Sequence, residues 1–352
     1  MSSRPVIAVD LGGTRIRAAV VLPDGSRLAR VERPTPSADG PSAVLAACRD
    51  VARRARRSAP ADVAAAIAGI GLSSPGPVDP ARGVVLEPPN LGPHFRDIPL
   101  AADLSAAEDL PAFLDRDTNV AALGEHAFGA ARGEDDFIYL TVSTGVGGAI
   151  ITGGELLHGP DGLAGELGHV PVGLDGPPCG CGGVAHVEAY AAGASLARMA
   201  AELVVNGGSA FLVTRARALH RGEELSAKDV AEGSLAGDPA CERLMNDARR
   251  AVAAGCVGYV NAFNPHRIVI GGSIAEAEGE RMLGPIRRAI ATEVFSVLSR
   301  VVQVVPAALG GDVSLAGCQP LVMRRLANQD QRSQSTTMRS DRPVAVPGGT
   351  HP

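Results

Sequence analysis

The chain opens on Val6-Ile7-Ala8-Val9-Asp10-Leu11-Gly12-Gly13-Thr14, in which a short apolar run stops at an aspartate and a pair of glycines. The apolar run is typical of a buried strand, and the glycines are typical of a tight turn directly after it. The pattern then predicts a second strand over residues 16–22 and, after a Pro-Asp-Gly turn, a third over residues 26–31. The opening segment therefore predicts three strands joined by two short turns.

A related pattern recurs near the middle of the chain. Residues 137–142 predict a strand, Ser143-Thr144-Gly145-Val146-Gly147-Gly148 a glycine turn, and residues 149–152 the next strand. The other expected elements are a helix over 42–57, a strand near 67–72, a Pro/Gly-rich loop over 74–79, helices over 187–203 and 239–261, and a strand over 267–270 that ends in Gly271-Gly272-Ser273. This alternation predicts an α/β fold with an internally duplicated strand-turn-strand unit.

The composition is that of an ordinary globular protein. The 352 residues are 45% hydrophobic and 20% charged, which is enough for a substantial core and two domains. A net charge of -5 and an aromatic content of 3% argue against a nucleic-acid partner. No apolar stretch approaches the roughly 20 residues that span a bilayer, so we expect no membrane partner and a cytoplasmic location.

Three glycine turns directly follow predicted strands, at residues 10–14, 143–148 and 271–273. Glycine lets the backbone approach a ligand closely, and successive free N–H groups bind phosphate oxygens. Each turn alone is also explained by hairpin geometry, and none matches the Walker or dinucleotide fingerprint. Together, with an aspartate ending the first strand, they indicate the cleft of a two-lobed phosphotransferase.

Two further stretches make the pattern specific: Asp117-Thr118-Asn119-Val120-Ala121-Ala122-Leu123-Gly124-Glu125 and Ala164-Gly165-Glu166-Leu167-Gly168-His169. With the glycine turns, they make the sequence from about residue 6 to residue 317 resemble the ROK family of sugar kinases and sugar-responsive repressors. This resemblance implies the two-lobed actin-like ATPase (ribonuclease H-like) fold. It places a small lobe at residues 1–117, completed by a C-terminal helix near 312–326, and a large lobe at 118–311. Residues 327–352 are polar and without periodicity, and we expect them to be a disordered tail.

The resemblance also implies roles for individual residues. The residues expected at the nucleotide and its phosphates are Asp10, Gly12, Gly13, Thr14, Thr144, Gly145, Gly147, Gly271 and Gly272. Those expected at the sugar are Gly76, Asn90, Arg116, Asp117, Glu166, His169 and Glu188. Carboxylates and imidazole suit a sugar because it presents paired hydrogen-bond donors and acceptors.

Asp117 is the expected catalytic residue. By the resemblance it receives the proton of the sugar hydroxyl that attacks the γ-phosphate, in a reaction that otherwise needs mainly positioning and charge neutralisation. The residue pattern alone also fits a plain helix cap, because an aspartate before an Ala-rich stretch is a common helix start. One departure concerns its neighbour: many ROK kinases have asparagine where this chain has Arg116, and guanidinium cannot accept a hydrogen bond.

A metal site is expected after His169. Family members commonly bind zinc through this histidine and three cysteines in a Cys-x-Cys-Gly-x-x-Gly-Cys run, and here His186 stands at the last cysteine position. The resemblance implies structural Zn²⁺ on His169, Cys179, Cys181 and His186. Two thiolates and two imidazoles form an accepted tetrahedral zinc shell. The alternative is a glycine-rich loop with incidental cysteines.

The resemblance implies transfer of phosphate from ATP with Mg²⁺ to the 6-hydroxyl of a hexose, with glucose as the first choice. N-acetylglucosamine and N-acetylmannosamine remain open as acceptors, and polyphosphate as a donor. An alternative from another class is a non-catalytic, sugar-sensing ROK regulator. Such relatives carry a helix-turn-helix domain before the first phosphate motif, whereas Asp10 stands near the start of this chain. A homodimer or homotetramer is expected.

Overall fold

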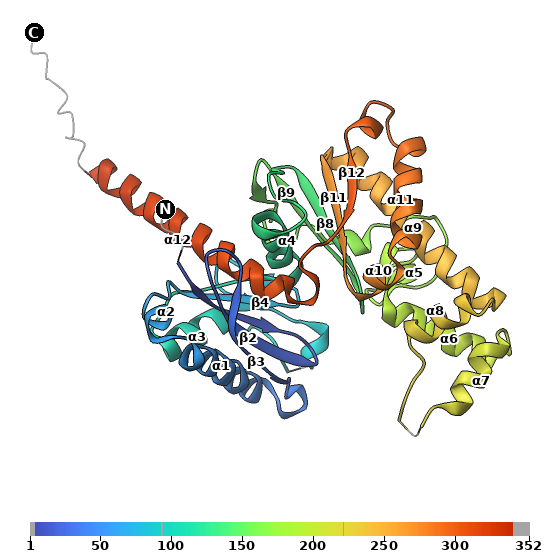
Figure 1. Cartoon of the computed structure of the whole chain (residues 1–352), viewed down its shortest axis with the longest axis horizontal. Coiled ribbons are helices and arrows are strands. Elements are labelled where there is room, and N and C mark those ends of the chain that lie inside the picture. The colour runs from blue at the N-terminus through green and yellow to red at the C-terminus, as the bar shows by residue number, and fades with distance from the viewer. Residues whose placement is uncertain (1–3, 93, 221, 341–352) are drawn as a thin grey trace, which may run out of the picture.

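Two five-stranded sheets of the same topology form the centres of two lobes in the computed structural model, which describes residues 4–92, 94–220 and 222–340 (Figure 1). The first sheet has the order β3-β2-β1-β4-β7 and the second the order β10-β9-β8-β11-β12. In each sheet the first three strands along the chain are antiparallel neighbours, and the last two add in parallel. The predicted duplication is therefore confirmed at the level of the whole sheet.

The strands of the first sheet are β1 (Val6–Leu11), β2 (Arg15–Val21), β3 (Arg27–Pro34), β4 (Ile70–Ser74) and β7 (Ala112–Arg116). Those of the second are β8 (Phe137–Val142), β9 (Val146–Thr152), β10 (Glu155–Leu156), β11 (Arg267–Gly271) and β12 (Gln303–Pro306). A small ribbon pairs β5 (Val78–Asp79) with β6 (Val84–Val85).

The helices of the small lobe are α1 (Pro41–Ser58), α2 (Ala61–Ala65) and α3 (Leu100–Glu108). The large lobe carries α5 (Val187–Ala191), α6 (Gly193–Val205), α7 (Ala210–Ala218), α8 (Ala227–Leu235), α9 (Pro239–Phe263), α10 (Ser273–Glu278) and α11 (Glu280–Glu293). Two more helices, α4 (Asp117–Phe128) and α12 (Val313–Ser340), lie where the lobes meet. Short 3₁₀ turns occur at Ser37–Asp39, Pro89–Leu91, Leu167–His169, Leu298–Arg300 and Gly310–Asp312.

The first strand is apolar throughout because both of its faces are covered. Ile7 and Val9 belong to a core shared with α1, whereas Val6 and Ala8 belong to a second core shared with α4 and α12. Side chains alternate across a strand, so a strand buried on both sides reads as a continuous apolar run. Residues 6–9 are therefore all apolar because alternate side chains of this strand enter two separate cores.

Helices α4 and α12 join the lobes through that second core. It combines Val6 and Val21 of the first sheet with Phe137 and Ile151 of the second. The two helices approach closely because each has a glycine at the contact: a Cβ at Gly124 would lie 2.8 Å from Val313 O, and one at Gly317 would overlap Val120 O. The floor of the cleft between the lobes is thus a packed helix pair.

The stretch expected as a tail differs from the prediction as far as residue 340. Helix α12 runs through to Ser340, and residues 341–352 lie outside the described residues. The helix can continue because the first proline or glycine beyond Pro320 is Pro343. Leu326 packs against the core between the lobes, whereas residues 328–331 are exposed.

Truncation after Gln331 is expected to change the melting temperature by less than about 2 °C, because the deleted part follows an exposed segment. Truncation after Met323 is the comparison. It also removes Leu326, the hydrogen bond that Arg324 donates to Gly154 O at 2.6 Å and the ion pair of Arg325 with Asp115 at 3.5 Å. We expect this deletion to lower the melting temperature by several degrees in differential scanning calorimetry.

The helix predicted over residues 187–203 is broken into α5 and α6 at Ala192, which has extended backbone angles. The reason is a contact with the second glycine turn. Gly193 N donates to Ser143 O at 2.8 Å, and Ala194 N donates to Thr144 O at 3.1 Å. The first residues of α6 therefore hold the glycine turn at residues 143–148 through backbone hydrogen bonds.

None of the helices among the described residues is by itself long and apolar enough to cross a membrane; α6 and α7, bent by 100° to each other, meet that criterion only as a pair.

Candidate functional site

Two cavities adjoin in the cleft and share Asp117, Thr118 and Gly147 in their walls. The larger, of about 530 Å³, runs between the glycine turns after β1, β8 and β11 and the start of α12. The smaller, of about 410 Å³, lies between the loop at Gly76 and Pro77, the β7–α4 junction and the loop that carries Glu166 and His169. Asp117 is thus exposed to both compartments.

The glycines of the turns are required by close approach of other chain segments. A Cβ at Gly13 would lie 2.8 Å from the Cβ of Asn90, and one at Gly147 would lie 2.7 Å from Thr118 Cγ2. Gly272 has a φ of +93°, and a Cβ there would lie 2.5 Å from Val142 O. The turns therefore line the larger cavity mostly with backbone, as a phosphate-binding surface requires.

An arginine adds positive charge to this cavity. Arg17 lines the wall and donates to Asp10 Oδ2 from Nε at 3.0 Å and from Nη2 at 2.6 Å. Its Nη1 donates to Gly311 O at 2.6 Å, and Ser73 Oγ donates to the other Asp10 oxygen at 2.8 Å. Asp10 therefore lies behind the wall and holds the guanidinium in place.

Asp117 is the first residue of α4, and its position differs from that of a helix cap. The N-cap is Arg116, which makes no capping side-chain bond, and Asp117 Oδ1 accepts from the adjacent Thr118 N at 2.7 Å. Burial raises the pKa of Asp117 to about 6, and the carboxylates of Asp10 and Glu166 add to the rise. The group is ionised at neutral pH and is a stronger base than an ordinary aspartate.

Arg116 and Glu166, which both line the smaller cavity, form an ion pair. Arg116 Nη1 donates to Glu166 Oε1, and its Nη2 donates to Gly148 O and to Ala164 O, each at 2.9 Å. Glu166 Oε2 lies 4.0 Å from His169 Nε2. The side chains of Glu166 and His169 thus converge at the edge of this compartment.

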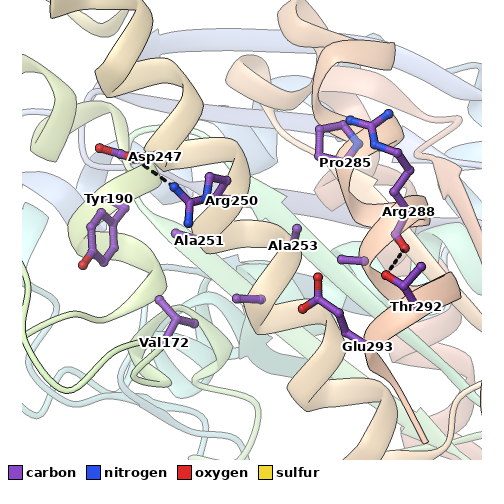
Figure 2. A pocket seen from close by; sticks show the side chains of 12 residues that line it. Val172, Tyr190, Asp247, Arg250, Ala251, Ala253, Pro285, Arg288, Thr292 and Glu293 are labelled. Carbon is purple, nitrogen blue, oxygen red and sulfur yellow. Dashed lines mark hydrogen bonds and ion pairs between the residues drawn. The ribbon is translucent and has the colours of Figure 1, made fainter. Parts of the chain in front are cut away.

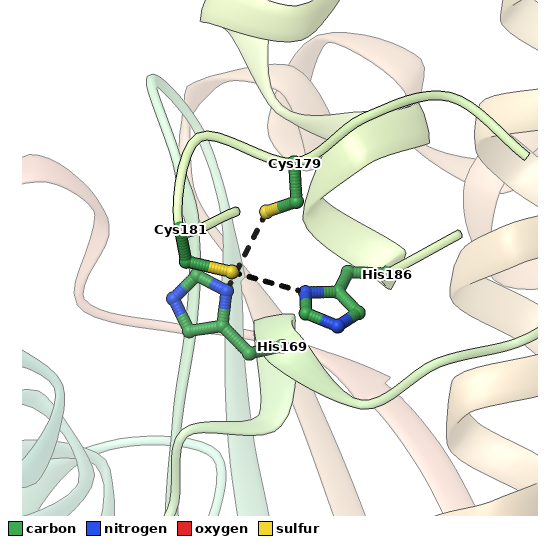
Figure 3. A group of neighbouring side chains, drawn as sticks. All are labelled: His169, Cys179, Cys181 and His186. Atoms are coloured by element: carbon green, nitrogen blue, oxygen red, sulfur yellow. Dashed lines mark hydrogen bonds between the residues drawn. The ribbon is translucent and has the colours of Figure 1, made fainter. Parts of the chain in front are cut away.

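Next to the smaller cavity, His169, Cys179, Cys181 and His186 form a cluster (Figure 3). Their ligand atoms all lie within 4.8 Å of one another. Cys179 Sγ lies 3.6 Å from His169 Nδ1, and Cys181 Sγ lies 3.3 Å from His186 Nδ1. Two sulfurs and two imidazole nitrogens at these separations fit one tetrahedral metal ion. Nδ1 of His169 faces the cluster, and Nε2 of the same ring faces Glu166.

An apolar cavity of about 490 Å³ adjoins the 530 Å³ cavity of the cleft and shares Ser143, Thr144 and Ser273 with it. Its other walls include Leu196, Lys228, Met245 and Ile274 from α6, α8, α9 and α10, and Leu225 from the segment before α8. The segment before α8 and the break at α6 therefore shape a mostly apolar chamber beside the second glycine turn.

A cavity of about 580 Å³ lies outside the cleft, along α9 and α11 (Figure 2). Asp247 and Arg250 in its wall pair with each other at 4.0 Å, and Thr292 Oγ1 donates to Arg288 O at 3.0 Å. None of the residues expected at the nucleotide, sugar or metal lines it. Volume alone does not make it a reaction site, because the groups able to do chemistry converge in the cleft.

Comparisons with known proteins agree with this geometry. Residues 6–325 match the ROK family. The chain belongs to the ROK family. A glucokinase of Thermotoga maritima is 32% identical over 326 residues, which cover 93% of this chain and 99% of that protein. The structure of a ROK hexokinase from Thermus thermophilus is 35% identical with a TM-score of 0.75, covering 92% of this chain and 99% of that one. A ROK glucokinase of Streptomyces griseus, in complex with glucose and AMPPNP, is 32% identical with a TM-score of 0.74, covering 91% and 99%.

The ROK residues expected at the site are distributed over both compartments. Gly12, Gly13, Thr144, Gly145, Gly147 and Gly272 line the larger cavity, and Gly76, Arg116, Glu166 and His169 line the smaller one. Asn90 and Glu188 were expected at the sugar but line the larger cavity. Asp10, Thr14 and Gly271 line neither cavity. The roles assigned to these residues remain predictions.

Sequence reasoning missed two features of this ROK site. The first is Arg17, for which the sequence signal was a pair of arginines, Arg15 and Arg17, at the start of the otherwise apolar strand β2. Arg15 is exposed, and Arg17 is the partly buried one that lines the cavity. Lys228 and the apolar side chains of the chamber come from α6, α8, α9, α10 and the segment before α8, and only the tertiary structure brings these segments together.

Proposed function

We propose that this ROK protein is a sugar kinase that transfers the γ-phosphoryl group of MgATP to the 6-hydroxyl of a hexose, with glucose as the preferred acceptor. The observation that carries the proposal is the position of Asp117 at the junction of two compartments. One compartment is lined by glycine turns and an arginine, and the other by carboxylate, guanidinium and imidazole. A carboxylate between a phosphate site and a polyol site is placed to accept the proton of the attacking hydroxyl.

In the proposed mechanism the glycine turns at residues 10–14 and 143–148 bind the phosphates through backbone N–H groups, and Arg17 offsets the charge of the phosphates. The apolar chamber takes the adenine, and Ser273 and Gly272 at the start of α10 lie between it and the phosphates. Glu166 and His169 bind sugar hydroxyls and aim the 6-hydroxyl at the γ-phosphorus. As the phosphoryl group moves, the hydroxyl proton passes to the carboxylate of Asp117.

The four-residue cluster is proposed to hold a structural zinc ion through His169, Cys179, Cys181 and His186. All four ligands come from protein, so the ion has a structural rather than a water-activating role. If His169 held zinc through Nδ1, its Nε2 would be the protonated nitrogen and would donate to a sugar hydroxyl. His169 would then contact the sugar as a single tautomer.

The test is a coupled ADP-release assay with glucose, mannose, fructose, N-acetylglucosamine and N-acetylmannosamine, with and without Mg²⁺. With polyphosphate in place of ATP, which releases no ADP, the sugar phosphate is measured instead. We expect Mg²⁺-dependent turnover with the highest kcat/KM for glucose. A higher kcat/KM for an acetamido sugar would move the substrate assignment to that sugar. If calorimetry showed sugar binding but no combination of donor and sugar gave ADP or sugar phosphate, the protein would instead belong to the class of non-catalytic regulators.

A further inference from the structure

Arg116, the residue that departs from the usual family pattern, is held by the protein itself. It is 6% exposed at the β7–α4 junction. Among the described residues, four of its five N–H donors have partners: Thr118 Oγ1 on Nε at 2.9 Å, Glu166 Oε1 on Nη1, and Gly148 O and Ala164 O on Nη2. A guanidinium bound in this way cannot rotate toward a ligand without breaking several buried hydrogen bonds.

Two glycines make room for this side chain. A Cβ at Gly76 would lie 3.0 Å from Arg116 Cδ, and one at Gly165 would lie 2.8 Å from Nη2. Gly165 also has a φ of +88°, which disfavours other residues. The walls of the smaller cavity therefore close over the arginine, which lies behind Glu166.

As a consequence, one carboxylate oxygen of Glu166 is fixed by Arg116, and the other is left to bind a ligand beside His169. Oε1 is bound by Arg116, and Oε2 lies 4.0 Å from His169 Nε2. A hydroxyl between these two atoms can donate to Oε2 and accept from the Nε2 proton, with ordinary hydrogen-bond lengths to both. The Glu166 side chain is 48% exposed and lacks a rigid environment of its own.

We propose that Arg116 is a positioning residue that sets sugar selectivity through Glu166 rather than by binding the sugar. This inference rests on the proposed sugar kinase activity. Arg116 aims Oε2 at one hydroxyl, which His169 also reads, so that a sugar lacking this hydroxyl leaves two polar groups unpaired. A chain with asparagine at this position would use the residue as a sugar contact instead, as the family resemblance implies.

The test is a double-mutant cycle with Arg116→Met and Glu166→Gln. Each variant is expected to raise KM for glucose by roughly 10- to 100-fold, with a smaller fall in kcat, because one charged hydrogen bond to the sugar is weakened. The KM of the double variant should be no higher than that of the single variant with the higher KM, because both changes remove the same contact. Multiplied effects in the double variant would overturn the proposal, since they would mean that Arg116 contacts the sugar independently.

Monodeoxyglucoses give a second readout. The wild type should discriminate strongly against one of them, and both single variants should lose discrimination against that same analogue. Loss against different analogues would also contradict the proposal. Arg116→Lys, which keeps the charge and one bond to Glu166, should restore part of the affinity, and it serves if Arg116→Met does not fold. A wild type inactive with every sugar would refute the kinase activity, whereas an active wild type with independent effects would refute this inference alone.

A pH profile shows how the charges of Arg116 and Glu166 act on Asp117. The charged groups that act on Asp117 are Asp10 from β1, Arg116 from β7 and Glu166 from the loop before His169, and of these only Arg116 lowers its pKa. Arg116→Met should therefore move the acid limb of kcat/KM to higher pH, and Glu166→Gln should move it to lower pH.

Discussion

Asp117→Asn is expected to lower kcat by about 10²-fold or more, with a much smaller change in sugar affinity measured by calorimetry. Asparagine keeps the shape of the side chain and its hydrogen bonds but cannot accept a proton. Because Arg116 is the N-cap of α4, the helix should form equally well in the variant. Exposed Asp62→Asn on α2 is the control and should leave turnover unchanged. Wild-type turnover in the Asp117→Asn variant would refute the assigned mechanism.

The same carboxyl gives the pH dependence. Burial raises the pKa of Asp117 to about 6, so kcat/KM should fall about tenfold per unit below that pH as the base becomes protonated. A raised folded-state pKa also means that the ionised group costs stability above pH 6, and that this cost is relieved as pH falls toward 4. Asp117→Asn should therefore stabilise the ligand-free protein at pH 7, on the order of 1 kcal/mol because the group faces solvent in the cleft. The gain should vanish near pH 4.

The sequence alone predicts an ordinary pKa near 3.9 for this residue, because an aspartate at a helix start is favoured by the helix dipole. The structure differs because the fold buries the carboxyl of Asp117, which raises its pKa, and because the carboxylates of Asp10 and Glu166, which are distant along the chain, add to the rise. The sequence shows which charged residues the chain contains and how they are spaced. It does not indicate which charges face one another across two lobes.

The glycine turns were predictable from a local pattern, whereas the cavity that Asn90 lines was not. A strand followed by Gly12 and Gly13 is a local pattern, and it folds as a turn wherever the strand lies. Asn90 sits in the turn Pro89–Leu91, whose local pattern states only that it is a loop. Its position against Gly13 depends on the packing of that loop onto the first sheet.

Loss of the proposed zinc ion is expected to raise KM for the sugar by about tenfold or more and to lower the melting temperature by several degrees. Cys179→Ala removes a ligand whose sulfur lies 3.6 Å from His169 Nδ1, so the imidazole that reads the sugar loses its fixed orientation. Elemental analysis should give about one zinc per wild-type chain and much less for the variant. The matched control is Leu174→Ala, in the same loop, because Leu174 is 97% exposed and lies outside the cluster.

Cys181→Ser separates the metal from the packing of the loop. Cys181 is exposed, and serine occupies nearly the same volume, so little stability is lost except through the metal. Its effects on zinc content and sugar KM should match those of Cys179→Ala, whereas KM for ATP should change less, because Cys181 lines neither the phosphate cavity nor the apolar chamber. Metal-free protein with full activity and an unchanged sugar KM would show that the cluster does not orient His169. The loop would then be held by its other contacts, such as the hydrogen bonds from Cys179 N to Gly183 O at 2.8 Å and from Arg198 Nη2 to Pro178 O at 3.1 Å.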